Sequence, residues 1–225
     1  MSRFLTIGLF SVAGLALSST SAMALTQSAQ FNSVGPKQDV TITLNAGANT
    51  QNVAAGLMNW TSTGGGIKGG GEQFKTFCIE VDQNIGGGNI VTFNVVAPEL
   101  APNTAPAGVI KAALLSELYG RFFAGLVSGN NQQHAAFQLA VWEIVYDNGV
   151  SLSADSFQVT SAPTGTAALA QSWLDALNGT GPMIVLSALT HPTRQDQLVP
   201  FSVIPTPGAM AVLGLGGLVA TRRRR

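Results

Sequence analysis

Cysteine, histidine and charge are all scarce in this chain. Its 225 residues include one cysteine and two histidines, and only 10% are Asp, Glu, Lys or Arg. A single thiol cannot form an internal disulfide, so Cys78 needs another explanation. Neither His134 nor His191 stands in a recognisable catalytic motif. By contrast, 46% of the residues are hydrophobic, which is enough to build a sizeable core.

Positive charge is outnumbered by negative charge in the body of the chain. Residues 25–221 hold six basic against eleven acidic side chains, so this part carries a net charge of minus five. A body of that sign has no basic stripe to follow phosphates, which argues against nucleic-acid binding. The glycine triplets lack a following Gly-Lys-Ser/Thr and predict loops, not a phosphate cradle. The length suits one domain, and no metal or cofactor is expected.

The first 24 residues have the layout of a signal peptide. Arg3 supplies the positive start, residues 4–17 form an uncharged apolar stretch, and Ala22-Met23-Ala24 offers a small-residue cleavage site. The apolar stretch is shorter than the roughly 20 residues that a spanning helix needs. We therefore expect export, with cleavage by a signal peptidase after Ala24.

The last 22 residues, 204–225, combine prolines, an apolar stretch and a basic end. The uncharged residues 209–220 would reach only about 18 Å as a helix, against about 30 Å of hydrocarbon, so this membrane segment is a poor permanent anchor. A basic cluster favours the cytoplasmic side of a membrane. The prolines and arginines of this segment are Pro205, Pro207, Arg222, Arg223, Arg224 and Arg225, with Thr206 between the prolines.

This order of features resembles the PEP-CTERM sorting tail, with Pro-Thr-Pro where the family usually has Pro-Glu-Pro. The resemblance implies transient anchoring in the inner membrane and cutting near the prolines by an exosortase-type protease. The protein would then reach the cell envelope, the cell surface or the extracellular matrix.

The body, residues 25–203, predicts a mixed α+β fold. Alternating or apolar runs predict strands, and apolar residues at helical spacing predict two to three helices in the middle. We expect an antiparallel β-sandwich or barrel core with a helical insertion. The predicted strands are 39–44, 74–81, 90–96, 183–189 and 197–203, with a glycine turn between the second and third; the predicted helices are 111–125, 131–146 and 166–177.

Three short motifs in this body occur in a meaningful order. The first is Phe77-Cys78-Ile79-Glu80, and the second is Gln138-Leu139-Ala140-Val141-Trp142 on a predicted helix. Late in the chain, Gln195 and Gln197 precede the apolar pair Leu198-Val199. Together the motifs resemble the bacterial thioester domains of surface adhesins, in which a cysteine bonds to a late glutamine.

The resemblance implies an internal thioester between Cys78 and one of the two late glutamines. Gln195 has the polar follower that the family pattern asks for, whereas Gln197 lies closer to the apolar pair; we favour Gln195 and keep Gln197 open. A thiol held against an amide carbonyl can expel ammonia and leave an activated acyl group. An amine on a partner surface would then bond to it permanently. This is single-use bonding without turnover, so no enzyme activity is expected.

Competing interpretations concern the same residues. Gln138 lies on one helix stripe with Val141, Trp142 and Val145, so we expect it to hold the backbone of the cysteine strand, and we expect the indole N–H of Trp142 to find an acceptor. A Cys78–His134–Asp147 hydrolase and a cation site at Glu80 and Asp82 are weaker alternatives. We expect the histidines on the surface or at a helix end, and the two carboxylates on a solvated strand face.

A second class of function remains open. In it, Cys78 is only a buried apolar side chain, and the protein is a non-reactive structural component of the envelope or matrix.

Overall fold

The computed structural model describes residues 24–86, 88–102 and 104–200. The expected signal peptide, except Ala24, and the expected sorting tail lie outside the described residues. Among those that are described, no helix is long and apolar enough to cross a membrane. The elements are β1 (Thr26–Leu44), β2 (Asn49–Gly65), β3 (Gln73–Cys78), β4 (Ile90–Val96), η1 (Pro98–Leu100), α1 (Gly108–Phe122), η2 (Phe123–Ser128), α2 (Asn131–Tyr146), β5 (Gln158–Ser161), α3 (Thr166–Asp175), β6 (Leu186–His191) and β7 (Arg194–Pro200).

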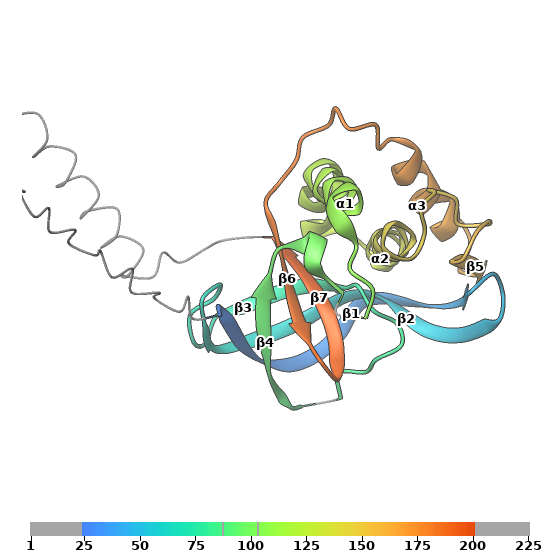
Figure 1. Cartoon of the computed structure of the whole chain (residues 1–225). Coiled ribbons are helices and arrows are strands. Elements are labelled where there is room, and N and C mark those ends of the chain that lie inside the picture. Colours follow the sequence, from blue (N-terminus) through green and yellow to red (C-terminus); the bar gives the residue numbers. More distant parts are fainter. Residues whose placement is uncertain (1–23, 87, 103, 201–225) are drawn as a thin grey trace, which may run out of the picture.

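The strands form an antiparallel sheet that closes on itself. Their order is β2-β3-β7-β6-β4-β1-β5, and an additional pairing joins β2 to β1. Six strands therefore make a ring, to which β5 adds at one end of β1 (Figure 1). Closure leaves fewer unpaired strand edges than an open sheet. The expected α+β fold is confirmed, in its barrel form.

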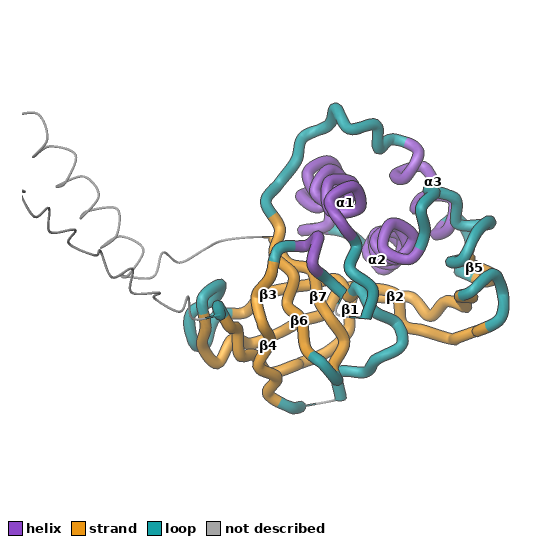
Figure 2. Tube along the Cα trace, viewed as in Figure 1, coloured by secondary structure: helices purple, strands orange, loops and turns teal. Residues whose placement is uncertain are grey.

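Strand β1 makes this closure possible because it is long enough to serve three neighbours. Its first residues pair with β4 on one side and with the end of β2 on the other. Its last residues pair with the start of β2 and with β5. The long β1–β2 ribbon is thus shared between the barrel and the helical side of the molecule (Figure 2).

The helices gather on one side of the strands, with α2 in the middle. Helix α2 has the predicted bounds, and it begins with a capping box between Asn130 and Gln133. Every residue from 134 to 145 is buried, because α2 lies against β1, β2 and β3 and against α1 and α3. On a helix that is covered on all sides, each side chain is either apolar or hydrogen-bonded. Its polar residues therefore need partners inside the protein.

The strand predictions were wrong in several places. Alternation predicted a strand over residues 74–81, but β3 ends at Cys78, where the chain turns away and the backbone N–H of Ile79 bonds to the Asp196 carbonyl instead. The glycine turn does not make neighbours of β3 and β4, since β7 and β6 stand between them on one side of the ring and β2 and β1 on the other. The closing strands lie at 186–191 and 194–200, because a tight turn after His191 sets their register. Strands β2 and β5 and the first part of β1 were not predicted.

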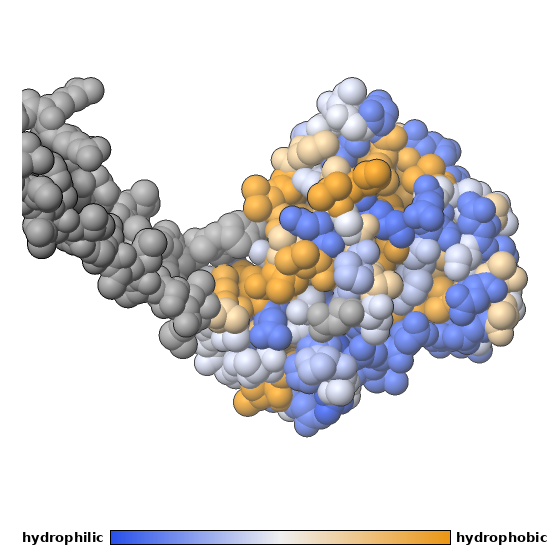
Figure 3. All heavy atoms as spheres, viewed as in Figure 1, coloured by the Kyte–Doolittle hydropathy of each residue, from blue (hydrophilic) through white to orange (hydrophobic). Residues whose placement is uncertain are grey.

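Exposed apolar side chains gather over α1 and the segment that leads into β6 (Figure 3). Val109, Ile110 and Met183 line a shallow apolar groove there, and Val185 is exposed beside Leu186. This patch shares no residue with the groove that contains Gln195, described below.

Candidate functional site

Cys78 is the last residue of β3 and is fully buried. Its neighbour Phe77 packs against Phe137 of α2, with ring centroids 4.6 Å apart. Successive strand side chains point to opposite faces, so Cys78 points away from that aromatic contact. Its thiol donates a hydrogen bond to the backbone carbonyl of Glu80 at 2.6 Å. The sulfur therefore lies where β3 ends and the chain folds back on itself.

Gln138 holds the backbone of Cys78 from the helix. Its carbonyl oxygen accepts from the Cys78 N–H at 3.0 Å, and its amide nitrogen donates to the Cys78 carbonyl at 2.7 Å. Gln138 is 1% exposed, so both bonds are buried. The Gln138 side chain therefore takes the place of a neighbouring strand at the end of β3. The position of Gln138 on one helix face with Val141 and Trp142 predicted this role. Both its oxygen and its nitrogen are thus bonded to the backbone of Cys78.

Gln195 reaches the same carbonyl as the cysteine. Its amide nitrogen donates to the Glu80 oxygen at 2.6 Å. The thiol of Cys78 donates to that oxygen at the same distance, so sulfur and amide nitrogen are separated by no more than twice this length. The structure thus brings Cys78 and Gln195 together from opposite halves of the chain.

Gln197 is also near Cys78, but its carboxamide is engaged elsewhere. It stands directly opposite Cys78 in the β3–β7 register, so both side chains share one face of the sheet. Its oxygen accepts from the Thr76 hydroxyl at 2.8 Å, and that hydroxyl accepts from the buried indole of Trp60. Its nitrogen donates to the backbone of Gln195. Gln197 is completely buried within this network.

A groove of about 670 Å³ opens over Gln195 and Trp142. Cys78 is fully buried and does not line it, whereas the partly buried Gln195 does. Access to the pair therefore runs past Gln195. We call this cavity the Gln195 groove; its remaining walls are residues Phe31, Val34, Gln51, Asn52, Val53, Ala54, Met58, Val81, Asp82, Gln83, Asn84, Ile85 and Gly86.

The thiol is held in its neutral form. Burial raises the pKa of Cys78 to about 12, and this effect outweighs the opposing influence of Trp142 and of the Glu80 backbone. A neutral buried thiol is a poor free nucleophile, because the thiolate is the reactive form. Reaction of this sulfur therefore requires a partner group in direct contact. The same burial protects the thiol from oxidants in the surrounding solution.

Trp142 lies beside the thiol, and Ala140 is a fully buried residue of the same helix. Trp142 is 2% exposed, and its indole N–H has no hydrogen-bond partner among the described residues. The expectation that this N–H finds an acceptor was therefore wrong. It interacts with Cys78 closely enough to lower the pKa of the thiol, but without the geometry of a full hydrogen bond.

The two weaker alternatives receive no support from the geometry. His134 is buried and lies in the first turn of α2, which agrees with the expected place at a helix end, and its Nδ1 lies 2.9 Å from the Asn130 carbonyl. Asp147 accepts from the backbone N–H groups of Ser156 and Phe157. Within the described part of the chain, no hydrogen bond connects these side chains to Cys78.

Glu80 and Asp82 differ from their expected solvated face. Asp82 is exposed, but Glu80 is 1% exposed and its carboxylate accepts from the Thr104 hydroxyl and from the Asp196 N–H. The expectation was wrong for Glu80 because the strand pattern does not continue past Cys78. No group of three His, Cys, Asp or Glu side chains in the described ranges could hold a metal ion.

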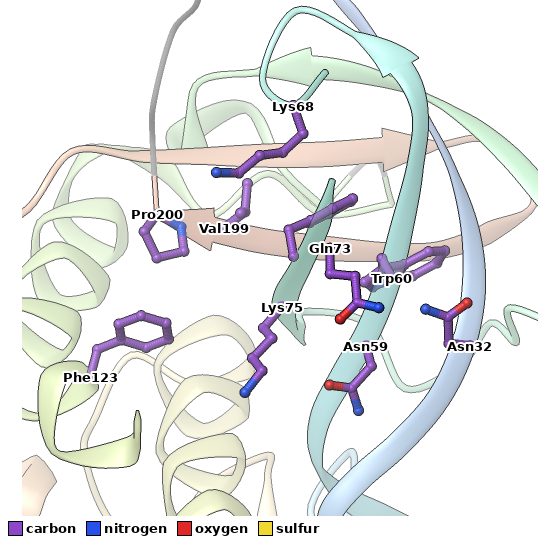
Figure 4. A pocket seen from close by; sticks show the side chains of 10 residues that line it. Asn32, Asn59, Trp60, Lys68, Gln73, Lys75, Phe123, Val199 and Pro200 are labelled. Carbon is purple, nitrogen blue, oxygen red and sulfur yellow. The ribbon is translucent and has the colours of Figure 1, made fainter. Parts of the chain in front are cut away.

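A second, smaller pocket of about 300 Å³ lies at another part of the barrel (Figure 4). Lys68 and Lys75 enter it from different sides, while Asn32, Asn59 and Gln73 lie together on one wall. Cys78, Gln195 and Trp142 do not line it. This pocket is therefore separate from the candidate site.

Sequence reasoning missed the backbone carbonyl of Glu80, which joins the two halves of the site. Nothing in the residue types marks it, because any residue at position 80 has a carbonyl. The signal that existed was positional, since Glu80 stands two residues after Cys78 in the first motif. Comparisons with models of protein families, with curated proteins and with solved structures find no match for this chain.

Proposed function

We propose that this chain is an exported surface protein that forms an internal thioester between Cys78 and Gln195 and bonds through it to an amine-bearing partner. The observation that carries the proposal is that the Cys78 thiol and the Gln195 carboxamide both donate to the Glu80 carbonyl at 2.6 Å. Groups held this closely react with effective concentrations that can reach about 10⁵ M or more.

Formation of the thioester needs no external reagent. The sulfur adds to the carboxamide carbon of Gln195, the C–N bond breaks, and the thiol proton leaves with the nitrogen as ammonia. An amine that later enters the groove forms a new amide and returns a proton to the sulfur. Burial of Cys78 supports this assignment, because exclusion of water protects an activated acyl group from hydrolysis.

Gln195 fits the role of acyl donor better than Gln197. The carboxamide of Gln197 is buried and fixed by Thr76, so an incoming amine has no route to it. Gln195 lines the groove and is only partly buried. Export, sorting by the tail and processing near Pro205 and Pro207 belong to the same proposal, and they rest on the sequence alone.

The intact mass of the purified mature protein tests the proposal. We expect a mass lower by one ammonia than the sequence requires, and addition of methylamine to the whole population. The Cys78→Ala and Gln195→Ala variants should show the unmodified mass and no methylamine adduct. Gln132→Ala is the control, because it removes another glutamine carboxamide, one that bonds to Thr164 in an exposed place, and this variant should still lose one ammonia.

The opposite result would favour a second function. Cys78 is fully buried with a satisfied thiol, as expected of an inert core side chain in a structural envelope protein. An unmodified mass in the wild-type protein, with a thiol that reacts after denaturation, would support that interpretation and remove the thioester.

A further inference from the structure

The indole N–H of Trp142 is a buried donor that lacks an acceptor. Trp142 is 2% exposed, and no hydrogen-bond partner for its nitrogen exists among the described residues. Buried polar groups in folded proteins are almost always satisfied, so an exception at a candidate site calls for a functional explanation. Desolvating this donor is unfavourable unless a later state supplies an acceptor.

The donor stands where the sulfur and the carboxamide meet. Trp142 lines the Gln195 groove together with Gln195, and its indole interacts with the Cys78 thiol. In any acyl group bonded to that sulfur, the carbonyl oxygen is on the carbon that is attached to the sulfur. The indole N–H is therefore placed to meet this oxygen.

Other donors around Cys78 are already engaged. The N–H of Cys78 donates to Gln138, that of Ile79 to Asp196, and that of Val81 to the Tyr146 hydroxyl. The amide nitrogen of Gln138 donates to the Cys78 carbonyl. None of these three backbone N–H groups can turn to a new oxygen without breaking an existing bond, whereas the indole N–H of Trp142 has no such bond to break.

We propose that the indole N–H of Trp142 stabilises the oxyanion on Oε1 of Gln195 when the Cys78 sulfur adds to the carboxamide carbon, and again when an amine adds to the thioester. This inference rests on the proposed function. In the first step the S–C bond forms, the C–N bond breaks and the thiol proton leaves with ammonia. In the second step an N–C bond forms, the C–S bond breaks and the proton returns to the sulfur. Fixed donors aimed at developing negative charge stabilise the transition states of acyl transfer.

The Trp142→Phe variant tests this role, because phenylalanine keeps an aromatic ring but removes the N–H. We expect the rate of methylamine addition, followed by intact mass, to fall by roughly 10- to 100-fold, in line with the loss of one oxyanion donor. Formation of the thioester after refolding should slow as well. Trp173→Phe is the matched control: Trp173 stacks on Phe122 with ring centroids 5.1 Å apart and does not line the Gln195 groove.

A second measurement covers the case in which Trp142→Phe does not fold. The resonance of the Trp142 indole N–H should move to lower field in the thioester form than in the Cys78→Ala variant, because only the bond to sulfur fixes the Gln195 carbonyl oxygen beside this N–H. An equal resonance position in the two proteins would overturn the inference, as would a well-folded Trp142→Phe protein that reacts within twofold of the wild type. A wild-type protein without the loss of ammonia would instead disprove the proposed function.

Discussion

At the scale of single residues, Gln138 satisfies two buried backbone groups, the N–H and the carbonyl of Cys78. Replacing it by Leu leaves the N–H and the carbonyl of Cys78 without partners in a buried place. Each such group costs about 1–3 kcal/mol, so we expect the free energy of unfolding to fall by roughly 2–4 kcal/mol. Denaturant unfolding measures this loss. Gln132→Ala on the same helix is the control, since it removes one exposed bond to Thr164 and should change the stability by about 0.5 kcal/mol or less. Similar losses in both variants would show that Gln138 does not fix the end of β3.

At the scale of elements, Glu117 fastens α1 to the segment after α3. Its buried carboxylate accepts from Arg121 and from the backbone N–H groups of Asn178, Gly179 and Gly181. Burial alone would raise the pKa of Glu117, but these donors lower it to about 2.

A pKa below the unfolded value of 4.5 means that this contribution to stability is present above pH 4.5 and is lost as the pH falls towards 2. We therefore expect the wild-type midpoint of thermal unfolding to fall over that range. Glu117→Gln should be less stable at neutral pH and should show a smaller decrease on acidification. An unchanged acid profile in the variant would contradict the assigned role.

Glu143 in α2 behaves in the opposite way. Burial raises its pKa to about 8, and the neighbouring charges of Asp147 and Asp155 add to this effect while Lys111 opposes it. One carboxylate oxygen accepts from the Ser151 N–H, and the other has no partner in the described part of the chain. The neutral acid is thus the form that fits the folded state.

Because the pKa of Glu143 lies above the unfolded value of 4.5, its contribution to stability is fully present below pH 4.5. This contribution is lost as the pH rises through 8. We expect Glu143→Gln to remain neutral and to flatten the dependence of unfolding free energy on pH between about 5 and 8. Chemical denaturation at several pH values measures the slope. Asp175→Asn, which removes an exposed carboxylate of α3, serves as the charge-removal control and should keep the wild-type slope.

At the scale of the whole molecule, the first residues of β1 close the barrel. Residues 26–30 pair with β4 on one side, and residues 27–30 with the end of β2 on the other. The Gln27 side chain is fully buried and bonds to the Ser62 hydroxyl and to the N–H groups of Ile67 and Lys68. The loop that the glycine triplets predict is therefore held by β1.

A chain that starts at Leu25 should fold, whereas one that starts at Phe31 should not. The shorter chain loses the strand that joins β2 to β4, and it exposes two strand edges together with the inner face of the barrel. Circular dichroism and thermal unfolding of the two proteins measure the difference. A cooperative transition in the shorter chain would show that closure of the ring is dispensable. The expected cleavage after Ala24 leaves this strand complete.

Local sequence patterns correctly predicted those elements whose packing in the fold matches their apolar spacing. The bounds of α2 and β4 follow from apolar spacing, and the contact of Gln138 with the cysteine strand follows from its place on a helix stripe. Strand β2 and the early part of β1 escaped prediction because their small and polar residues pair with strands on both sides, which alternation does not reveal. The end of β3 at Cys78 is set by Asp196, which lies far along the chain.

The sequence by itself determined the α+β class, the three helices, the scarcity of cysteine and the motifs around Cys78 and Gln138. These depend on composition and on contacts within a few residues. Only the tertiary structure decided that the sheet closes into a ring, that Cys78 and Gln195 meet at the Glu80 carbonyl, and that the Trp142 N–H is left without an acceptor. The reason is physical: backbone carbonyls and unpartnered donors acquire their roles from what the fold places beside them, and residue type does not encode that.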